Sequence, residues 1–521
     1  PDPTLALGKQ SMLKLISLWF VYRACGNTGL VRMAPGILKA LERVHLSWLS
    51  NAVIRRTFFA WFCAGEKERE IVQTMRQLKE SGIGSILDYS AEADISEDSE
   101  AASASARAQA NVKADALAKE YFHGMHMASQ VPHAFAAVKI TGLADPEVLY
   151  RLSMPYRPLR AAFEAADHDK DGRIDFAQFK NRVLPAMPGG GRVVSASGIF
   201  SMVDANNNDG LVDWVDIQAA LGMDNPLARP LYLRTTATGG GIDEYGAVES
   251  DIEDYERMIS RARAVVQQAA NKGVRAMVDA EHTYFQPMID HVALVMQREF
   301  NAPADGSAPS TLVFNTYQMY RADALQRMTD DYERSQREGW HFAAKLVRGA
   351  YMELERERAA RLGYPSPINP TLEATHDCYN RGVRFLLDRI ASAQNAPAPA
   401  AGALTPTLFV ATHNNDSVER ALQLVRHLQI DSASEPVMFG QLLGMQDATS
   451  YALAKANLPI YKYVPYGSLD EVLPYLIRRA QENSAVADSI LREASFVLRE
   501  IIRRATGAAR KESTVSSTSS L

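Results

Sequence analysis

The stretch FAAKLVRGAY, from Phe342 to Tyr351, is a short apolar run that becomes polar towards its end. An apolar run of this length without strict alternation is typical of a strand that is buried on both faces, as in a parallel sheet covered by helices. Arg348, Gly349 and Tyr351 follow the apolar part directly. The stretch therefore predicts a buried strand whose C-terminal end presents groups that bind a ligand.

Seven other runs of the same kind alternate with amphipathic helical segments. Eight strand–helix units predict an α/β fold of the closed (β/α)8 TIM-barrel type. A doubly wound sheet is the alternative, but the sequence contains no dinucleotide-binding fingerprint between a strand and a helix. The seven runs are ILDY (86–89), HAFAAVKITGL (133–143), VRAMVDAE (274–281), TLVFNTYQ (311–318), TLFVATHN (407–414), PVMFGQLLG (436–444) and PIYKYVPYG (459–467).

The remaining segments divide the chain into five parts. Apolar residues at helical spacing fill the first part, and a polar, Ala-rich loop of low complexity interrupts the second. Two acidic loops marked by glycine define the third. The predicted parts are an N-terminal helical arm (1–80), the first barrel strands (81–155), an inserted module (156–225), the rest of the barrel (226–505) and a disordered tail (506–521).

The composition is that of a soluble globular protein of 521 residues, with 47% hydrophobic and 22% charged residues. The formal net charge of −5 gives no indication of nucleic acid as a partner. Three scattered cysteines fit neither a metal site nor a disulfide framework, which favours a reducing compartment. No apolar run approaches the roughly 20 residues that a membrane span needs.

Polar residues end almost every predicted strand. A single such residue is more often a loop-facing or capping group, but a set at six or more strand ends predicts a lined pocket, because barrel sites form there. The set contains no nucleophile beside a base. Its cations, amides and phenol suit an anionic, phosphate-bearing cofactor and a small anionic substrate. The residues are Lys139, Asp279, Glu281, Gln318, Lys345, Arg348, Thr412, His413, Asn414, Gln441 and Tyr463.

Two adjacent arginines, Arg478 and Arg479, lie in the helical run EVLPYLIRRAQEN (471–483). A guanidinium binds a carboxylate through two parallel hydrogen bonds, so the pair predicts a carboxylate-binding site. A surface Arg–Glu pair explains the helix equally well. The helix alone does not decide between these interpretations.

The ordered motifs VKITGL, MVDAE, FNTYQ, KLVRGAY, VATHN, FGQLLGM, YVPYG and YLIRRAQEN closely resemble the proline dehydrogenase family, and its eukaryotic mitochondrial branch looks nearest. The resemblance implies a distorted barrel that binds FAD at the strand C-termini. It implies oxidation of L-proline to Δ1-pyrroline-5-carboxylate by hydride transfer to flavin N5. It further implies ubiquinone as electron acceptor and peripheral association with the matrix side of the mitochondrial inner membrane, although no intact targeting signal is visible.

The resemblance also assigns roles to individual residues. Lys139, Arg478 and Arg479 should bind the substrate carboxylate, and Asp279 should lie near substrate and flavin and help to orient Lys139. Lys345 stands where many bacterial members have arginine, so its contact with the flavin stays open. The residues expected around the substrate ring are Tyr351, Leu442 and Tyr463; those expected around FAD are Gln318, Lys345, Val347, Arg348, Gly349, Ala350, Thr412, His413, Asn414 and Gln441.

The inserted segment contains the run DHDKDGRIDFAQF, which matches an EF-hand calcium loop up to its last position. There Gln178 replaces the usual bidentate glutamate. A second run, DANNNDGLVDWVD (204–216), is one residue too long. A paired EF-hand fold is expected, and Ca²⁺ binding or a purely structural module both stay open. The candidate Ca²⁺ ligands are Asp167, Asp169, Asp171, Arg173 and Gln178.

Three other functions compete with proline oxidation. Hydroxyproline dehydrogenase is the first. The resemblance implies a smaller residue in that sister family at the position of Tyr463, which leaves room for the ring hydroxyl, so Tyr463 argues for proline. The second is a barrel aldolase that forms a Schiff base on Lys139 or Lys345. The third is a calcium-sensor scaffold with an inactive barrel. The complete set of strand-end residues argues against a calcium-sensor scaffold, because an inactive barrel does not need it.

Overall fold

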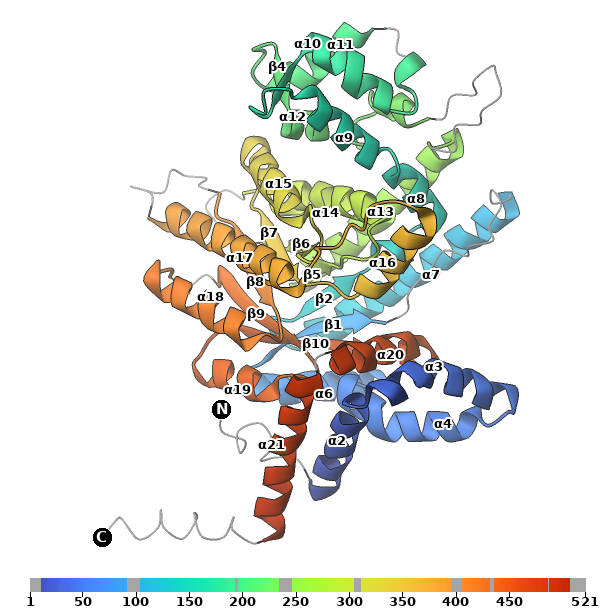
Figure 1. Cartoon of the computed structure of the whole chain (residues 1–521), viewed down its shortest axis with the longest axis vertical. Helices are drawn as coiled ribbons and strands as arrows, with labels where there is room; N and C mark the ends of the chain where they lie inside the picture. The colour runs from blue at the N-terminus through green and yellow to red at the C-terminus, as the bar shows by residue number, and fades with distance from the viewer. Residues whose placement is uncertain are drawn as a thin grey trace.

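A computed structural model describes residues 11–90, 104–192, 195–233, 246–303, 311–395, 404–431, 435–485 and 487–506. Eight parallel strands close into a barrel in the order β1-β10-β9-β8-β7-β6-β5-β2 (Figure 1). The predicted (β/α)8 fold is therefore confirmed, strand for strand. The strands are β1 Gly84–Tyr89, β2 Phe135–Val138, β5 Arg275–Val278, β6 Val313–Gln318, β7 Ala343–Val347, β8 Thr407–Ala411, β9 Val437–Leu442 and β10 Ile460–Tyr466.

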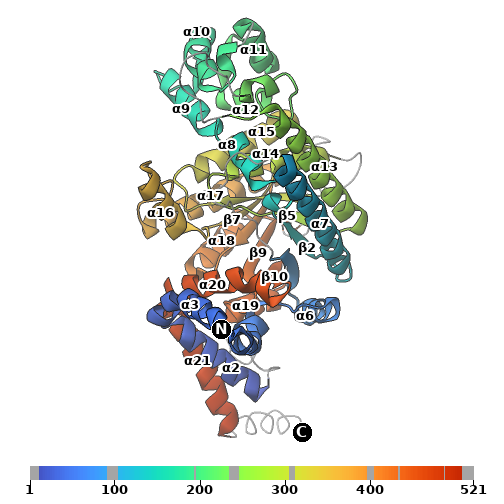
Figure 2. The same ribbon diagram turned by 90° about the vertical axis from the view of Figure 1, so that its right-hand side faces the viewer.

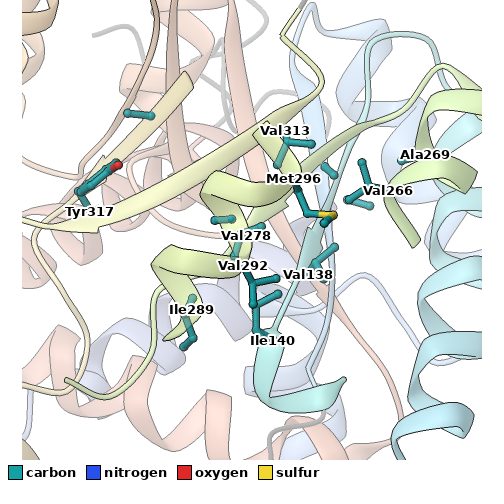
Figure 3. Packing of buried hydrophobic residues seen from close by; sticks show 14 of the residues in the cluster. Val138, Ile140, Val266, Ala269, Val278, Ile289, Val292, Met296, Val313 and Tyr317 are labelled. Atoms are coloured by element: carbon teal, nitrogen blue, oxygen red, sulfur yellow. The ribbon is translucent and has the colours of Figure 1, made fainter. Parts of the chain in front are cut away.

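Helices surround the strands and bury their outward faces. In Figure 3, Val138 and Val278 on neighbouring strands lie close to Val292 and Met296 of α14, all within one hydrophobic core. Inside the barrel, aromatic rings such as Phe135 fill the space between the strands. The surrounding helices are α6 Glu68–Glu80, α7 Ala104–Ser129, α8 Pro146–Ser153, α13 Glu249–Lys272, α14 Gln286–Phe300, α15 Ala324–Glu338, α16 Met352–Leu362, α17 Leu372–Gln394, α18 Asn415–His427, α19 Asp447–Lys455 and α20 Leu469–Ala485.

The inserted segment folds around a hydrophobic core of its own at one end of the molecule (Figure 1). Helices precede and follow each acidic loop, and the loops pair through the antiparallel strands β3 Arg173–Asp175 and β4 Leu211–Asp213. Ion pairs from Arg160 and Arg337 fix the segment to α15. Its helices are α9 Tyr156–Ala166, α10 Phe176–Gln178, α11 Ala196–Val203 and α12 Trp214–Ala220.

The first helices pack on the last ones at the opposite end (Figure 2). One apolar cluster joins α2, Met12–Cys25, to α20 and to α21, Ala487–Ala505. Then α3 (Thr28–Arg43) and α4 (Ser47–Ile54) lead through a short π-helical turn and α5 (Ala60–Phe62) to the barrel. Among the described residues, no helix is long and apolar enough to cross a membrane.

Two sequence predictions lie partly outside the described residues. The low-complexity loop includes residues 91–103, which the structure does not describe, but the helix predicted after it is present as α7. The predicted disordered tail falls on residues 507–521, which are also not described.

Candidate functional site

A cavity of about 1080 Å³ lies at the C-terminal ends of the barrel strands. It is lined by every residue that the sequence predicts for substrate or cofactor binding, and helices α2 and α21 add to its walls. The predicted residues in the lining are Lys139, Asp279, Gln318, Lys345, Val347, Arg348, Gly349, Ala350, Tyr351, Thr412, His413, Asn414, Gln441, Leu442, Tyr463, Arg478 and Arg479.

Lys139 follows β2 and is buried at the floor of the cavity. Its Nζ donates to Asp88 Oδ1 at 2.5 Å and to the carbonyl oxygen of Tyr89 at 3.1 Å. The sequence led us to expect that Asp279 helps to orient Lys139. The Lys139 charge does act on Asp279, but the hydrogen bonds given above are to Asp88 and Tyr89. β1 and β2 are hydrogen-bonded neighbours, which places Asp88, one residue before the end of β1, beside Lys139.

Asp279 follows β5 and binds two other residues of the cavity. Its Oδ1 accepts from Lys345 Nζ at 2.6 Å, and its Oδ2 accepts from Tyr463 Oη at 2.6 Å. Burial alone raises a carboxyl pKa, but the charges of Lys345 and Lys139 and the two hydrogen bonds hold the pKa of Asp279 below its ordinary value. Burial and the Asp279 charge raise the pKa of Tyr463 well above its ordinary value. Asp279 is therefore an anion, and Tyr463 keeps its proton.

The two arginines of α20 both line the cavity, as the carboxylate-binding interpretation of that helix requires. Arg479 is buried, and its guanidinium lies over the ring of Tyr475 at 5.1 Å. Arg478 lies over the ring of Tyr351 at 5.6 Å. Together with Lys139, these groups make one wall of the cavity cationic, so this part of the site suits a small carboxylate.

Arg348 follows β7 on another side of the cavity. It donates to Thr412 Oγ1 at 2.7 Å, to Ser417 Oγ at 2.9 Å and to His376 Nδ1 at 3.0 Å. Its guanidinium also lies over the ring of Tyr379 at 4.3 Å. These contacts are with uncharged groups, and burial lowers the pKa of Arg348. A positive charge held by neutral neighbours favours an anionic ligand such as a diphosphate.

The N-terminus of α18 faces the same part of the cavity. Asn414 caps this helix by accepting from the backbone N–H of Ser417 at 2.9 Å, and Asn414, Asn415 and Asp416 line the cavity. The partial positive charge of a helix N-terminus favours phosphate groups. Helix α18 and Arg348 therefore provide two independent features for a phosphate-bearing cofactor.

Gln318 offers an acceptor to a ligand. It ends β6, and its amide nitrogen donates to the carbonyl oxygen of Glu281 at 3.0 Å. Its Oε1 is buried, and no described residue donates to it. A buried acceptor of this kind indicates a ligand with an N–H group, because an unsatisfied buried oxygen costs free energy.

His413 connects two strand ends. Its Nε2 accepts from the backbone N–H of Leu442 at 3.0 Å. Burial lowers its pKa to about 3, so the ring is neutral at physiological pH and remains an acceptor. Gln441 Nε2 donates to the carbonyl oxygen of Thr412 at 3.4 Å. These bonds hold the strand ends of β8 and β9 together, as their neighbouring positions require.

Two further groups near the cavity were missed by the sequence analysis. Asp88 lies in the predicted strand ILDY. A carboxylate near the end of a strand was the sequence feature that could have identified it as a cavity residue. Glu493 of α21 lines the cavity opposite Tyr22 of α2. Burial and the charge of Asp447 raise the pKa of Glu493 to about 7. No local signal placed Glu493 there, because only tertiary packing brings α21 over the barrel.

The predicted calcium loop lies in the inserted segment, away from the cavity. One carboxylate oxygen from each of Asp167, Asp169 and Asp171 lies within 4.8 Å of the others. Gln178, at the last ligand position, is engaged elsewhere: its Oε1 accepts from the Asp175 backbone N–H and its Nε2 donates to the Ala166 carbonyl oxygen, both at 2.8 Å.

The side chains around the two loops also bind each other. Arg173 pairs with Asp209 of the second loop. At the end of that loop, Arg337 of α15 binds Asp213 at 2.7 Å and Asp216 at 3.1 Å. A guanidinium from the barrel thus neutralises the carboxylates that would end the second loop.

Comparisons with known proteins agree with this geometry. A family model described as Proline dehydrogenase matches residues 71–492. The chain is 32% identical to "Proline dehydrogenase 1, mitochondrial" of Homo sapiens, over 93% of this chain and 86% of that protein. It is also 32% identical to the protein of that name from Caenorhabditis elegans, over 96% of this chain and 87% of the relative.

Two other similarities show less. The chain is 41% identical to hydroxyproline dehydrogenase of Bos taurus over 48% of this chain and 51% of that protein. It resembles the crystal structure of proline utilization A from Bdellovibrio bacteriovorus inactivated by N-propargylglycine, with a TM-score of 0.55 and 15% identity. That structural match covers 90% of this chain and 37% of the other, and it supports the barrel fold alone.

Proposed function

The chain belongs to the proline dehydrogenase family, and we propose that it oxidises L-proline to Δ1-pyrroline-5-carboxylate with FAD as its cofactor. One observation carries the proposal beyond the family: a single cavity joins a cationic wall of Lys139, Arg478 and Arg479 to a phosphate-binding side around Arg348. A small amino acid and a large anionic cofactor each find suitable partners in it.

The substrate carboxylate binds to the cationic wall. Two guanidinium groups with a lysine ammonium fix a carboxylate in position and orientation, which brings the ring carbon beside the nitrogen to a defined place. Tyr351, Tyr463 and Leu442 line the cavity nearby and pack around the pyrrolidine ring. Substrate positioning is thus the main contribution of these residues.

The cofactor is held by the other side of the cavity. Arg348 and the N-terminus of α18 bind its phosphates, Gln318 accepts an N–H of its ring system, and the strand ends at Thr412 and His413 line its far side. When bound, FAD supplies the two-electron acceptor to which the substrate carbon passes its hydride. The residues fit this group, because the buried Gln318 Oε1 has no donor among the described residues and the hydrogen-bond partners of Arg348 given above are uncharged.

The pair of Asp279 and Lys345 sets the charge between the two halves of the cavity. Lys345 neutralises Asp279, and the Tyr463 hydroxyl donates a hydrogen bond to the same carboxylate. This hydrogen bond fixes the phenol oxygen of Tyr463, and the Tyr463 ring lines the substrate side of the cavity. The amine must be deprotonated for hydride transfer, and no strong base beyond solvent is required.

Electron transfer and location complete the proposal. We propose ubiquinone as the acceptor and peripheral association with the matrix side of the mitochondrial inner membrane, as the family resemblance implies. The names of the relatives support the mitochondrion alone. The division into helical arm, barrel and inserted module belongs to the same proposal.

Hydroxyproline is the second candidate substrate, favoured by the 41% identity to a hydroxyproline dehydrogenase over half the chain. Tyr463 occupies the space that the ring hydroxyl of hydroxyproline would need. Its own hydroxyl already donates a hydrogen bond to Asp279. The rejection is steric, so we expect proline to be preferred by kcat/KM.

The inserted module has an EF-hand-like arrangement, and its first loop is a candidate for weak Ca²⁺ binding. Three carboxylates face each other there, but Gln178 cannot supply the bidentate ligand. Arg337 already neutralises the second loop. The favoured role of the module is therefore structural, with millimolar Ca²⁺ as a minor ligand.

The decisive experiment is the visible spectrum of the purified protein before and after anaerobic L-proline. We expect a flavin spectrum that bleaches with proline and hardly with trans-4-hydroxyproline. Faster bleaching with hydroxyproline would reverse the substrate assignment. A colourless protein that FAD does not reconstitute would refute the flavoenzyme, and borohydride trapping on Lys139 or Lys345 would then support the aldolase.

A further inference from the structure

The N-terminal helices expose an unusual amount of apolar surface. Among the described residues, 11 of the 21 exposed large hydrophobic side chains lie between Leu13 and Val53. Trp48 is 67% exposed and Met33 is 63% exposed. Apolar side chains scattered singly need no explanation, but a concentration of this kind in about forty residues indicates an interaction surface.

The exposed side chains follow the helical repeat. On α2, Leu13, Ile16 and Phe20 recur at intervals of three and four residues, while the opposite face is buried against α20 and α21. On α3, Leu30, Met33 and Ile37 repeat the same spacing. Helix α4 has no buried residue at all. Each helix therefore presents an apolar stripe outward, which no described part of the chain covers.

The charge of the same segment is opposite to that of the protein. Between residues 12 and 54 there are five Lys and Arg residues and a single acidic residue, Glu42, which gives a net charge of +4 in a chain of net charge −5. The five cations are all exposed: Lys14, Arg23, Arg32, Lys39 and Arg43. Apolar stripes flanked by cations are the composition that binds anionic lipid surfaces.

We propose that α2, α3 and α4 form a membrane-docking surface that lies in the headgroup region of an anionic bilayer. The proposal deepens the peripheral membrane association proposed above by assigning it to these helices. No described helix is long enough to span a bilayer, so the helices lie along it. A second copy of the chain is a poorer occupant, because two surfaces of net charge +4 repel each other.

The docking surface adjoins the mouth of the catalytic cavity. Leu18 and Tyr22 of α2 line the cavity, as do Phe496 and Val497 of α21. Helix α21 also exposes Leu498 and Ile502 beside them. Docking through α2 therefore places the cavity mouth next to the bilayer, where an apolar quinone dissolves. Electrons reach a lipid-soluble acceptor without a separate carrier.

Flotation of the purified holoprotein with lipid vesicles tests the proposal. We expect the protein to float with vesicles of phosphatidylcholine and phosphatidylglycerol, less with phosphatidylcholine alone, and less again at high salt. The triple variant Leu30→Ser/Met33→Ser/Trp48→Ser should partition at least about tenfold more weakly. Arg32→Ser/Lys39→Ser should lose about fivefold per cation on the anionic vesicles alone.

The matched control is Val112→Ser/Leu227→Ser, which removes two apolar side chains that are 69% and 73% exposed on other parts of the molecule. It should float like the wild type. Turnover of proline with a water-soluble dye should be the same in all these proteins, which shows that each is folded.

Three results would overturn the proposal: no flotation of the wild type, equal flotation of the triple variant, or a wild-type dimer that the triple variant dissociates. The last would assign the surface to self-association. Flotation without any proline turnover would instead refute the proposed function and leave the docking surface intact.

Discussion

The barrel cavity and the inserted module both gather charged side chains, but they hold those charges in opposite ways. In the cavity, the side chains of Lys139 and Asp88 are only 7% and 3% exposed and lie 2.5 Å apart. In the module, the carboxylates of Asp169 and Asp171 are exposed and lie close to each other.

Burial explains why the difference matters. A buried charge depends on its partner, because removing that partner leaves a charge without solvent. An exposed charge keeps its water, so its neighbours contribute little to stability. Similar clusters of charged residues in the sequence therefore carry very different energetic weight, and four predictions test this contrast.

The largest effect is expected from Asp88→Asn. It leaves the buried ammonium of Lys139 without its carboxylate, and the free energy of unfolding should fall by about 3–5 kcal/mol in urea unfolding. The double variant Asp88→Asn/Lys139→Met should recover much of that loss, because neither member of the pair then carries a buried charge. The matched control is Asp115→Asn, an exposed carboxylate paired with Arg261, which should change stability by less than about 1 kcal/mol. Equal losses of stability in Asp88→Asn and Asp115→Asn would contradict the proposed difference between buried and exposed charges.

The next effect concerns catalysis. Arg479→Ala removes a buried cation from the substrate wall. The loss of transition-state stabilisation should be about 2–5 kcal/mol, so kcat/KM for L-proline should fall roughly 30-fold or more. Steady-state kinetics with a dye acceptor measure this. Arg381→Ala, which removes an arginine whose side chain is 65% exposed on α17, serves as the control. An unchanged kcat/KM in Arg479→Ala would remove this residue from the carboxylate site.

A smaller, pH-dependent effect is expected at the cavity mouth. The pKa of Glu493 is raised from an ordinary value near 4.3 to about 7. Its contribution to stability is therefore fully present below about pH 4.3 and is lost as the pH rises through 7. Between pH 5.5 and 8, Glu493→Gln should gain about 1–2 kcal/mol of stability relative to the wild type. Parallel pH profiles of the two proteins would show that Glu493 is ionised throughout.

The smallest effect is expected in the module. About 1 mM Ca²⁺ should raise the free energy of unfolding by less than about 1 kcal/mol and leave proline turnover unchanged. Asp169→Asn should abolish that gain, and Mg²⁺ at the same concentration should not reproduce it. A large Ca²⁺ effect on turnover would contradict the contrast, since an exposed cluster would then control the buried site.

The sequence predicted the strands well because each one is a continuous apolar run that ends in polar residues. This local pattern is enough to place Lys139, Gln318 and Arg348 at strand ends. It did not identify the partner of Lys139, because a contact between β1 and β2 depends on which strands are neighbours. It also missed Glu493, whose helix is amphipathic like any surface helix until it packs over the barrel.

The sequence by itself determined the barrel and the kinds of groups at its open end, because burial on both faces and strand-end polarity are properties of consecutive residues. The tertiary structure decided how those groups pair: Asp88 with Lys139, Asp279 with Lys345 and Tyr463, and Arg337 with the second acidic loop. Pairing joins residues up to 184 positions apart in the chain. Electrostatic energy depends on distance and solvent, and folding alone sets both.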